Sequence, residues 1–211
     1  MPKPAFPPKA TAILSPRTDA MPKIADIEYT PNPNARKFIL KEPLTSGLAR
    51  SFENAEQAQR DELAARLFDN PHVTNVFYVD NWITVTQDGE AEWEKLLREL
   101  ATPIREAPAA EQASEEFAKA AAWLAEDEGM AELSATDRAK LEQINELLDE
   151  EVRPYLQGDG GDLHVVSLEG NTLKVHYQGA CGTCPSSISG TLAGIEGLVR
   201  RIDPEMQVVA V

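Results

Sequence analysis

The first half of the chain alternates between apolar patterns typical of strands and of helices. Runs rich in β-branched and aromatic residues predict strands at 24–29, 37–40, 73–79 and 82–86. A turn signal at Pro31–Asn34 separates the first two strands, and Asp80-Asn81 is a two-residue hairpin signal between the last two. Helical stripes are marked by Leu63, Leu67 and Phe68, and by Trp93, Leu96, Leu97, Leu100 and Ile104. Residues 22–105 are therefore predicted to form a small α+β domain.

The last part of the chain, residues 136–211, predicts a second α+β domain with the order α-β-β-α-β. An apolar helical stripe from Leu141 to Val152 is expected to end before Pro154. The expected strands then cover residues 163–168, 172–178 and 206–211, with a helix through Ile188, Leu192, Ile195 and Val199 before the last strand. In the middle strand, Leu173, Val175 and Tyr177 face one way, and Lys174, His176 and Gln178 face the other.

The segments outside these two domains differ from them in composition. Residues 1–21 contain many prolines and are expected to form a disordered extension. Residues 106–135 form an acidic connector rich in alanine and glutamate. Phe117, Ala121 and Leu124 recur at helical spacing within the connector, which predicts either a partly helical spacer or a helix presented to a partner.

Composition excludes several classes of function. The net charge of −15 argues against a nucleic-acid partner. No apolar run approaches the roughly 18 residues that a membrane span needs, so no membrane partner is expected. Two cysteines do not make a secreted disulfide framework, and a thiol pair kept for chemistry fits a reducing compartment. The cytoplasm of a bacterium is the favoured location, with an organelle matrix as the alternative.

The candidate site is the segment Gly179–Ser187, which holds both cysteines, Cys181 and Cys184, in C-x-x-C spacing. Such a pair can exchange disulfides, bind zinc or hold iron. Two thiols cannot close a four-thiolate site within one chain, so either the pair is a redox dithiol or other ligands complete a metal site. The loop precedes a helix, whose free N–H groups and dipole are expected to favour thiolates, with Ser186 or Ser187 as the helix cap.

Other polar residues near the loop leave alternatives open. His164 and His176 are the histidines that a zinc site with the two cysteines would use, although their spacing resembles no common zinc module. Asp159 and Asp162 are expected to cap backbone N–H groups in a glycine-rich turn rather than bind metal. Tyr177, Trp82 and Trp93 are expected in the cores, and His72 carries no site signal.

The order of several motifs resembles one known family. Residues 152–162, the hairpin, the cysteine loop and Gly194-Ile195-Glu196 together resemble the NifU C-terminal-like (Nfu) domain, over residues 139–211. Thr30–Asn34, Lys37-Phe38 and residues 77–86 resemble the second module of Nfu proteins, the Nfu N-terminal domain.

This resemblance implies an iron–sulfur cluster scaffold or carrier in which Cys181 and Cys184 are the cluster ligands. It implies a homodimer that shares one cluster, with 4Fe–4S favoured and 2Fe–2S as the alternative. The implied partners are an upstream assembly scaffold and apo iron–sulfur acceptor proteins, and the implied protein is not an enzyme. No nucleophile–base pair, phosphate loop or nucleotide fingerprint appears in the sequence. The competing function is a thiol–disulfide oxidoreductase that uses the same dithiol.

Overall fold

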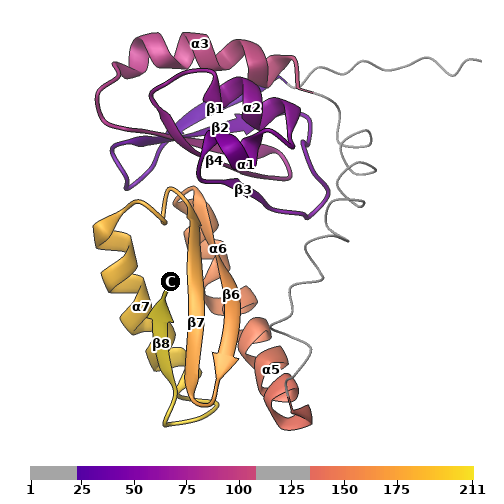
Figure 1. Cartoon of the computed structure of the whole chain (residues 1–211), viewed down its shortest axis with the longest axis vertical. Helices are drawn as coiled ribbons and strands as arrows, with labels where there is room; N and C mark the ends of the chain where they lie inside the picture. The colour runs from indigo at the N-terminus through magenta and orange to yellow at the C-terminus, as the bar shows by residue number, and fades with distance from the viewer. Residues whose placement is uncertain (1–22, 108–133) are drawn as a thin grey trace, which may run out of the picture.

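The computed structural model describes residues 23–107 and 134–211, and each of these ranges forms an α+β unit (Figure 1). The first unit, called the N-terminal domain below, is built on a five-stranded antiparallel sheet with the order β1-β2-β5-β4-β3. Its strands are β1 (Ile24–Tyr29), β2 (Ala35–Leu40), β3 (Arg50–Phe52), β4 (Val73–Val79) and β5 (Trp82–Gln87). Its helices are α1 (Ala55–Ala58), α2 (Glu62–Phe68) and α3 (Trp93–Arg105).

The core of the N-terminal domain lies on one face of this sheet. Phe38, Ile83, Val76 and Tyr78 point from three strands toward buried leucines of α2 and α3. Because side chains alternate along a strand, the intervening residues must point to the opposite face. Cross-strand pairing places three rows there: Ile39–Trp82–Val79, Lys37–Thr84–Phe77–Ser51 and Ala35–Thr86–Asn75. We call these residues the second face of the sheet.

The C-terminal domain comprises residues 134–211. Its elements are α5 (Ala135–Glu151), α6 (Arg153–Gly158), β6 (Gly161–Glu169), β7 (Thr172–Gly179), α7 (Pro185–Val199) and β8 (Gln207–Ala210). β6 and β7 form an antiparallel hairpin, and β8 joins the other edge of β7 in parallel. Leu163, Leu173 and Val175 of the sheet pack with Ile144 of α5 and Ile195 of α7 in a separate core.

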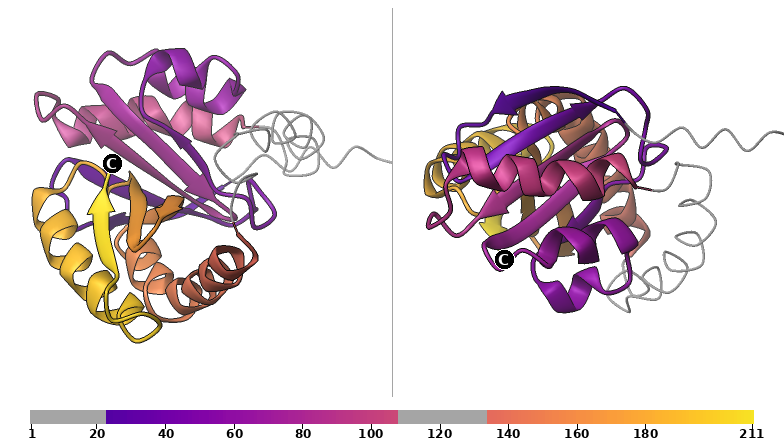
Figure 2. Two further views of the ribbon diagram at one scale, coloured as in Figure 1. Left: turned by 60° about the horizontal axis from the view of Figure 1, so that its bottom comes forward. Right: turned by 90° about the horizontal axis from the view of Figure 1, so that it is seen from above.

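The two domains contact each other through β4 and β5 of one and β7 of the other. Figure 1 shows the end of β7 and the start of α7 pointing up at the sheet of the N-terminal domain, while α3 covers the far side of that sheet. The views in Figure 2 show the same arrangement from two further directions. Most of the second face of the N-terminal sheet is buried, with Phe77 and Thr84 both 0% exposed, whereas Ile39, Ser51 and Trp82 are half-buried.

The expected α+β fold class is confirmed, with three additions. Strand β3, the single-turn helix α1 and the short helix α6 were not expected, because each is too short for a period of apolar residues to show. α6 begins at Arg153 and makes the observed order of the C-terminal domain α-α-β-β-α-β. The extension 1–21 and most of the connector, including the stripe at Phe117, lie outside the described residues. Within the described ranges, no helix is long and apolar enough to cross a membrane.

Candidate functional site

The cysteine loop links the end of β7 at Gly179 to the start of α7 at Pro185. Two backbone hydrogen bonds tighten it, from Gly182 N to Gly179 O (3.2 Å) and from Cys184 N to Cys181 O (3.4 Å). Cys184 itself is the N-cap residue of α7 and has an extended backbone, so the expectation that Ser186 or Ser187 caps the helix was wrong. Both cysteines are free thiols, and both are buried, with exposures of 1% and 4%.

Cys181 belongs to the C-terminal core, and the absence of a side chain at Gly161 lets it lie there. A Cβ at residue 161 would lie 2.5 Å from Gln178 O and 2.7 Å from Cys181 Sγ. Such distances are shorter than real Cβ contacts allow. The glycine-rich segment before β6 therefore shapes the space for the thiol as well as the turn that the sequence predicted.

Burial decides the protonation state of this thiol. Burial raises the pKa of Cys181 to about 12, and the negative charges of Asp159, Cys184 and Asp162 act in the same direction. The expectation that the helix start favours a thiolate at Cys181 is therefore wrong in this structure, because burial of Cys181 in the C-terminal core outweighs the effect of the helix dipole. Cys181 is a protonated thiol at neutral pH in this structure.

Asp162, at the start of β6, is buried and hydrogen-bonded. Asp162 is 5% exposed; its Oδ1 accepts a hydrogen bond from Leu163 N (2.8 Å) and its Oδ2 accepts one from Gln157 Nε2 (3.1 Å). Burial raises the pKa of Asp162, against the lowering effect of these bonds. The expected role of Asp162 as a cap for backbone N–H groups is consistent with this geometry.

His176, one of the two histidines considered for a zinc site, has its side-chain contacts away from the cysteines. His164 and His176 face each other across the β6–β7 hairpin. The Nδ1 atom of His176 lies 2.8 Å from Val211 O, and its Nε2 atom lies 2.5 Å from Glu53 Oε1 of the N-terminal domain. Across the described ranges, no cluster of three potential metal-binding side chains includes either cysteine. The geometry therefore gives no support to zinc bound by cysteine and histidine together.

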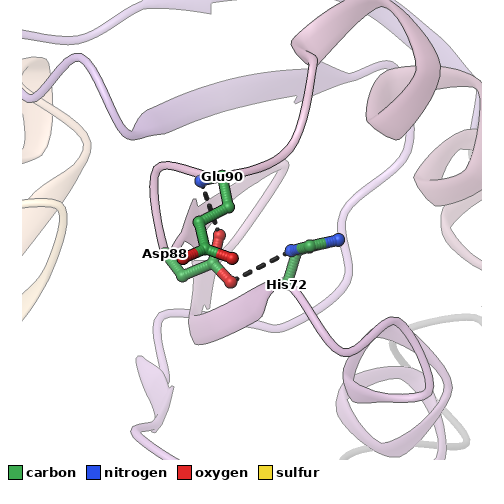
Figure 3. Close-up of side chains that lie close together, drawn as sticks. All are labelled: His72, Asp88 and Glu90. Atoms are coloured by element: carbon green, nitrogen blue, oxygen red, sulfur yellow. Dashed lines mark hydrogen bonds and ion pairs between the residues drawn. The ribbon is translucent and has the colours of Figure 1, made fainter.

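One cluster of potential ligands occurs where no site was expected (Figure 3). His72, Asp88 and Glu90 have ligand atoms within 4.8 Å of one another. The Nδ1 atom of His72 lies 3.0 Å from Asp88 Oδ2, and Glu90 N donates to Asp88 Oδ1 (2.8 Å). Pairing of β4 with β5 brings the ends of the hairpin together, so the predicted hairpin was the signal that placed His72 beside Asp88. The hydrogen bond between the His72 and Asp88 side chains and the turn closed by Glu90 N account for the cluster.

The aromatic residues expected in the cores are largely there. Tyr177 is 4% exposed within the C-terminal core. Trp93 packs against the N-terminal core, and its Nε1 atom donates to Pro33 O (3.1 Å). Trp82 differs, because it lies on the second face, where its ring packs against Phe77 at 5.3 Å.

Comparison with known proteins agrees with this two-part organisation. Residues 24–111 match the family described as scaffold protein Nfu/NifU N terminal, and residues 144–210 match the NifU-like domain family. The chain is also 32% identical over 180 residues to the human protein named NFU1 iron-sulfur cluster scaffold homolog, mitochondrial, covering 84% of this chain and 67% of that protein. The chain belongs to the Nfu family of iron–sulfur cluster scaffold proteins.

Another Nfu relative and one solved structure also match parts of the chain. The Drosophila persimilis protein of the same name is 32% identical over 183 residues, covering 85% of this chain and 62% of that protein. The solution structure of a NifU-like protein from Saccharomyces cerevisiae is 22% identical, with a TM-score of 0.37, covering 42% of this chain and 79% of that one. The chain thus spans somewhat under two thirds of several Nfu relatives that it matches.

Proposed function

We propose that this chain carries an iron–sulfur cluster on the thiolates of Cys181 and Cys184 and transfers it to apo-proteins. The observation that carries the proposal is the position of both cysteines on one tight loop of the domain that matches the NifU-like family. With Cys181 and Cys184 as its complete set of cysteines, one chain supplies half of a four-thiolate site. The second half would come from the same loop of another copy.

A shared cluster has consequences for symmetry and for release. A two-fold dimer uses the same surface twice, so the cluster would lie on or near the symmetry axis. The favoured cargo is 4Fe–4S, with 2Fe–2S as the alternative. Transfer would proceed by ligand exchange, in which thiolates of the acceptor replace Cys181 and Cys184 one after another. The chain would act as a carrier and not as an enzyme.

Anaerobic reconstitution of the metal-free chain with iron and sulfide tests this proposal. Size exclusion with iron and sulfide analysis should give a dimer with about two iron atoms per chain for one shared four-iron cluster. Cys181→Ser and Cys184→Ser should each abolish stable binding, because either change removes two of the four ligands of a symmetric dimer. A monomer that holds a complete cluster would contradict the proposal.

Matched controls separate the alternatives. His164→Ala and His176→Ala should leave the absorption spectrum of the cluster unchanged. Loss of metal in a histidine variant, or zinc in place of iron in the metal analysis, would favour a zinc module. Failure to take up iron, together with rapid reduction of protein disulfides by the dithiol, would favour the thiol–disulfide oxidoreductase.

A second part of the proposal concerns acceptor choice. The N-terminal domain contains no cysteine, so it supplies no thiolate, but it is tethered close to the loop. It would hold acceptors during ligand exchange. Transfer rates from the loaded full chain and from the loaded fragment 136–211 should then differ for some acceptors and not for others. Equal rates for every acceptor would leave the N-terminal domain without this function.

A further inference from the structure

Five buried apolar residues belong to the core of neither domain. Ala35, Phe77 and Val79 lie on the second face of the N-terminal sheet, and Ala180 and Cys184 lie on the cysteine loop. β4 and β5 contact β7, and a Cβ at Gly179, at the end of β7, would lie 3.1 Å from Phe77 Cβ. The N-terminal domain is therefore docked where β7 passes into the cysteine loop.

The Asn32 side chain forms hydrogen bonds with the loop beside both cysteines. Its Nδ2 atom donates to Ala180 O (3.1 Å) and to Thr183 Oγ1 (2.9 Å), and these two residues directly precede Cys181 and Cys184. Asn32 is 4% exposed and its bond to Ala180 O is buried, whereas its bond to the exposed Thr183 is only partly shielded from water. One side chain of the N-terminal domain thus holds both halves of the C-x-x-C loop.

The turn that carries Asn32 orients its amide for this contact. The Oδ1 atom of Asn32 accepts a hydrogen bond from Asn34 N (3.0 Å), and Thr30 Oγ1 donates to Asn32 O (2.8 Å). Pro31 and Pro33 restrict the backbone on both sides of Asn32. Because the oxygen is used within the turn, the NH2 group is the part that faces the loop.

Further contacts extend the docked surface around the loop. Lys37 Nζ on the second face donates to Gln157 O of α6 (2.9 Å) and lies 4.8 Å from the centre of the Trp82 ring. Gly160, at φ +82°, approaches the N-terminal sheet so closely that a Cβ there would lie 2.9 Å from Thr84 Oγ1. The N-terminal sheet therefore also fits closely against the segment between α6 and β6.

The second face nevertheless contains several buried polar atoms that lack hydrogen-bond partners within the described part of the chain. Ser51 Oγ, Asn75 Oδ1, Thr84 Oγ1 and Thr86 Oγ1 on the second face are buried, and none has a hydrogen-bond partner among the described residues. A buried polar atom without a partner loses its hydration and gains nothing in return. Opening the domains would return Thr84 Oγ1, which lies beside Gly160 of the C-terminal domain, to water. The two cores are separate clusters, so the domains can part without loss of either core.

We propose that the surface around Asn32 and Lys37 is a docking site for the chain's own cysteine loop, and that a second copy competes with it for that loop. The inference rests on the proposed function, because a cluster shared between chains requires the second loop to approach Cys181 and Cys184. To share a cluster, the second copy must reach the loop that Asn32 binds and the region beside Cys184. Docking and dimer formation therefore compete for the same loop. The docked form is the metal-free carrier, and loading with a cluster accompanies opening of the domains.

Alkylation of the metal-free full chain tests docking without any cluster. The rate constant for modification of Cys184 by iodoacetamide is measured by mass spectrometry of the peptides, at one fixed pH. Asn32→Ala removes both bonds to the loop. Lys37→Met removes the bond to Gln157, together with the 3.7 Å ion pair to the half-exposed Glu28, while keeping a side chain of similar length. Each change is expected to raise the rate about tenfold, as loss of a buried hydrogen bond shifts the opening equilibrium.

Two control variants match these changes. Asn34→Ala alters the same turn, and Lys41→Met removes a lysine that is exposed; neither side chain has a described contact with the C-terminal domain. Both controls should react at the rate of the unmodified chain. Circular dichroism checks that every variant is folded, and if Asn32→Ala unfolds the N-terminal domain, Lys37→Met decides the test.

The outcomes separate this inference from the proposed function. Faster alkylation in the two test variants and not in the controls supports docking, whether or not the chain takes up iron. Unchanged rates in folded test variants overturn it, even if reconstitution yields a cluster-bridged dimer. Under the inference, Asn32→Ala should also form that dimer at lower chain concentration than the unmodified protein does.

Discussion

Gly161 offers the sharpest test of how the fold shapes the cysteine loop. In Gly161→Ala, the new methyl group would lie 2.5 Å from Gln178 O, 2.7 Å from Cys181 Sγ and 2.9 Å from Cys181 Cβ. The Cys181 side chain can rotate away, but Gln178 O belongs to the backbone of the paired strand β7. The substitution must therefore distort the β6–β7 hairpin, move Cys181, or do both.

The expected cost follows from overpacking of a closely packed core. Extra methylene-sized groups in such cores cost about 1–3 kcal/mol. Gly161 does not have a positive φ, so the alanine loses less chain entropy on folding and recovers about 0.4–1 kcal/mol. The net loss of unfolding free energy should be roughly 1–2 kcal/mol, and for a domain of this size each kcal/mol lowers Tm by about 4–8 °C.

Gly194→Ala is the matched control, because it makes the same chemical change in open space. Gly194 lies within α7, is exposed, and has nothing within 4 Å of the position of a Cβ. Alanine in a helix interior is favoured over glycine by up to about 1 kcal/mol. The same substitution should thus destabilise the C-terminal domain at one position and stabilise it at the other.

Hydrogen exchange of β7 amides against urea concentration is the appropriate assay for the C-terminal domain. The tryptophans lie at positions 82, 93 and 123, so intrinsic tryptophan fluorescence reports on the rest of the chain. Trp82 lies at the contact with the C-terminal domain, so the fluorescence transition reports on the N-terminal domain together with its docking, and the comparison of the two variants rests on exchange of the β7 amides. A Gly161→Ala chain as stable as the unmodified one, with unchanged uptake of iron, would show that Gly161 does not set the position of Cys181.

Three further predictions concern the domains and their contact. Asp61→Ala removes the carboxylate that lies 2.7 Å from the Arg50 guanidinium, and both side chains are almost fully buried. The free energy of unfolding of the N-terminal domain should fall by about 3–5 kcal/mol, measured by urea unfolding followed by tryptophan fluorescence. A fall below about 1 kcal/mol would contradict this account of the pair. Partial burial lowers the pKa of His176, but the hydrogen bonds to the backbone oxygen of Val211 and to the Glu53 carboxylate outweigh this effect and raise the pKa overall. The contribution of the His176–Glu53 pair to docking should therefore be complete below the usual histidine pKa and disappear as pH rises through the raised value. The rate constant for alkylation of Cys184 in the unmodified chain, divided by that in Glu53→Gln, should rise toward one over this pH range. A ratio that stays constant would show that the pair does not contribute to docking. The fragment 136–211 should fold and take up iron in reconstitution, with faster alkylation than the full chain; a folded fragment that binds no iron would place an essential group elsewhere.

The sequence by itself determined most of the regular structure. Apolar alternation and hairpin signals act over a few residues, so β1, β4 and β5 lie within a residue of the expected limits, and α3 follows its apolar stripe. The two-cysteine count and the motif order also needed no coordinates, and they led to the family that the comparisons show. Short elements such as β3 and α1 were missed, because three or four residues display no period.

Only the tertiary structure decided what surrounds the cysteine loop. Asn32 and Ala180 are 148 positions apart, and no local pattern encodes a hydrogen bond over that separation. The alternation of β5 predicted two faces, but only the docked C-terminal domain explains why Thr84 is as buried as Ile83. The sequence likewise placed Cys181 just before a helix, where the helix dipole favours a thiolate. The pKa of Cys181 is instead set by its burial, which depends on the packing of the whole domain. Short-range sterics and periodicity are properties of a segment, but desolvation and docking are properties of the assembled fold.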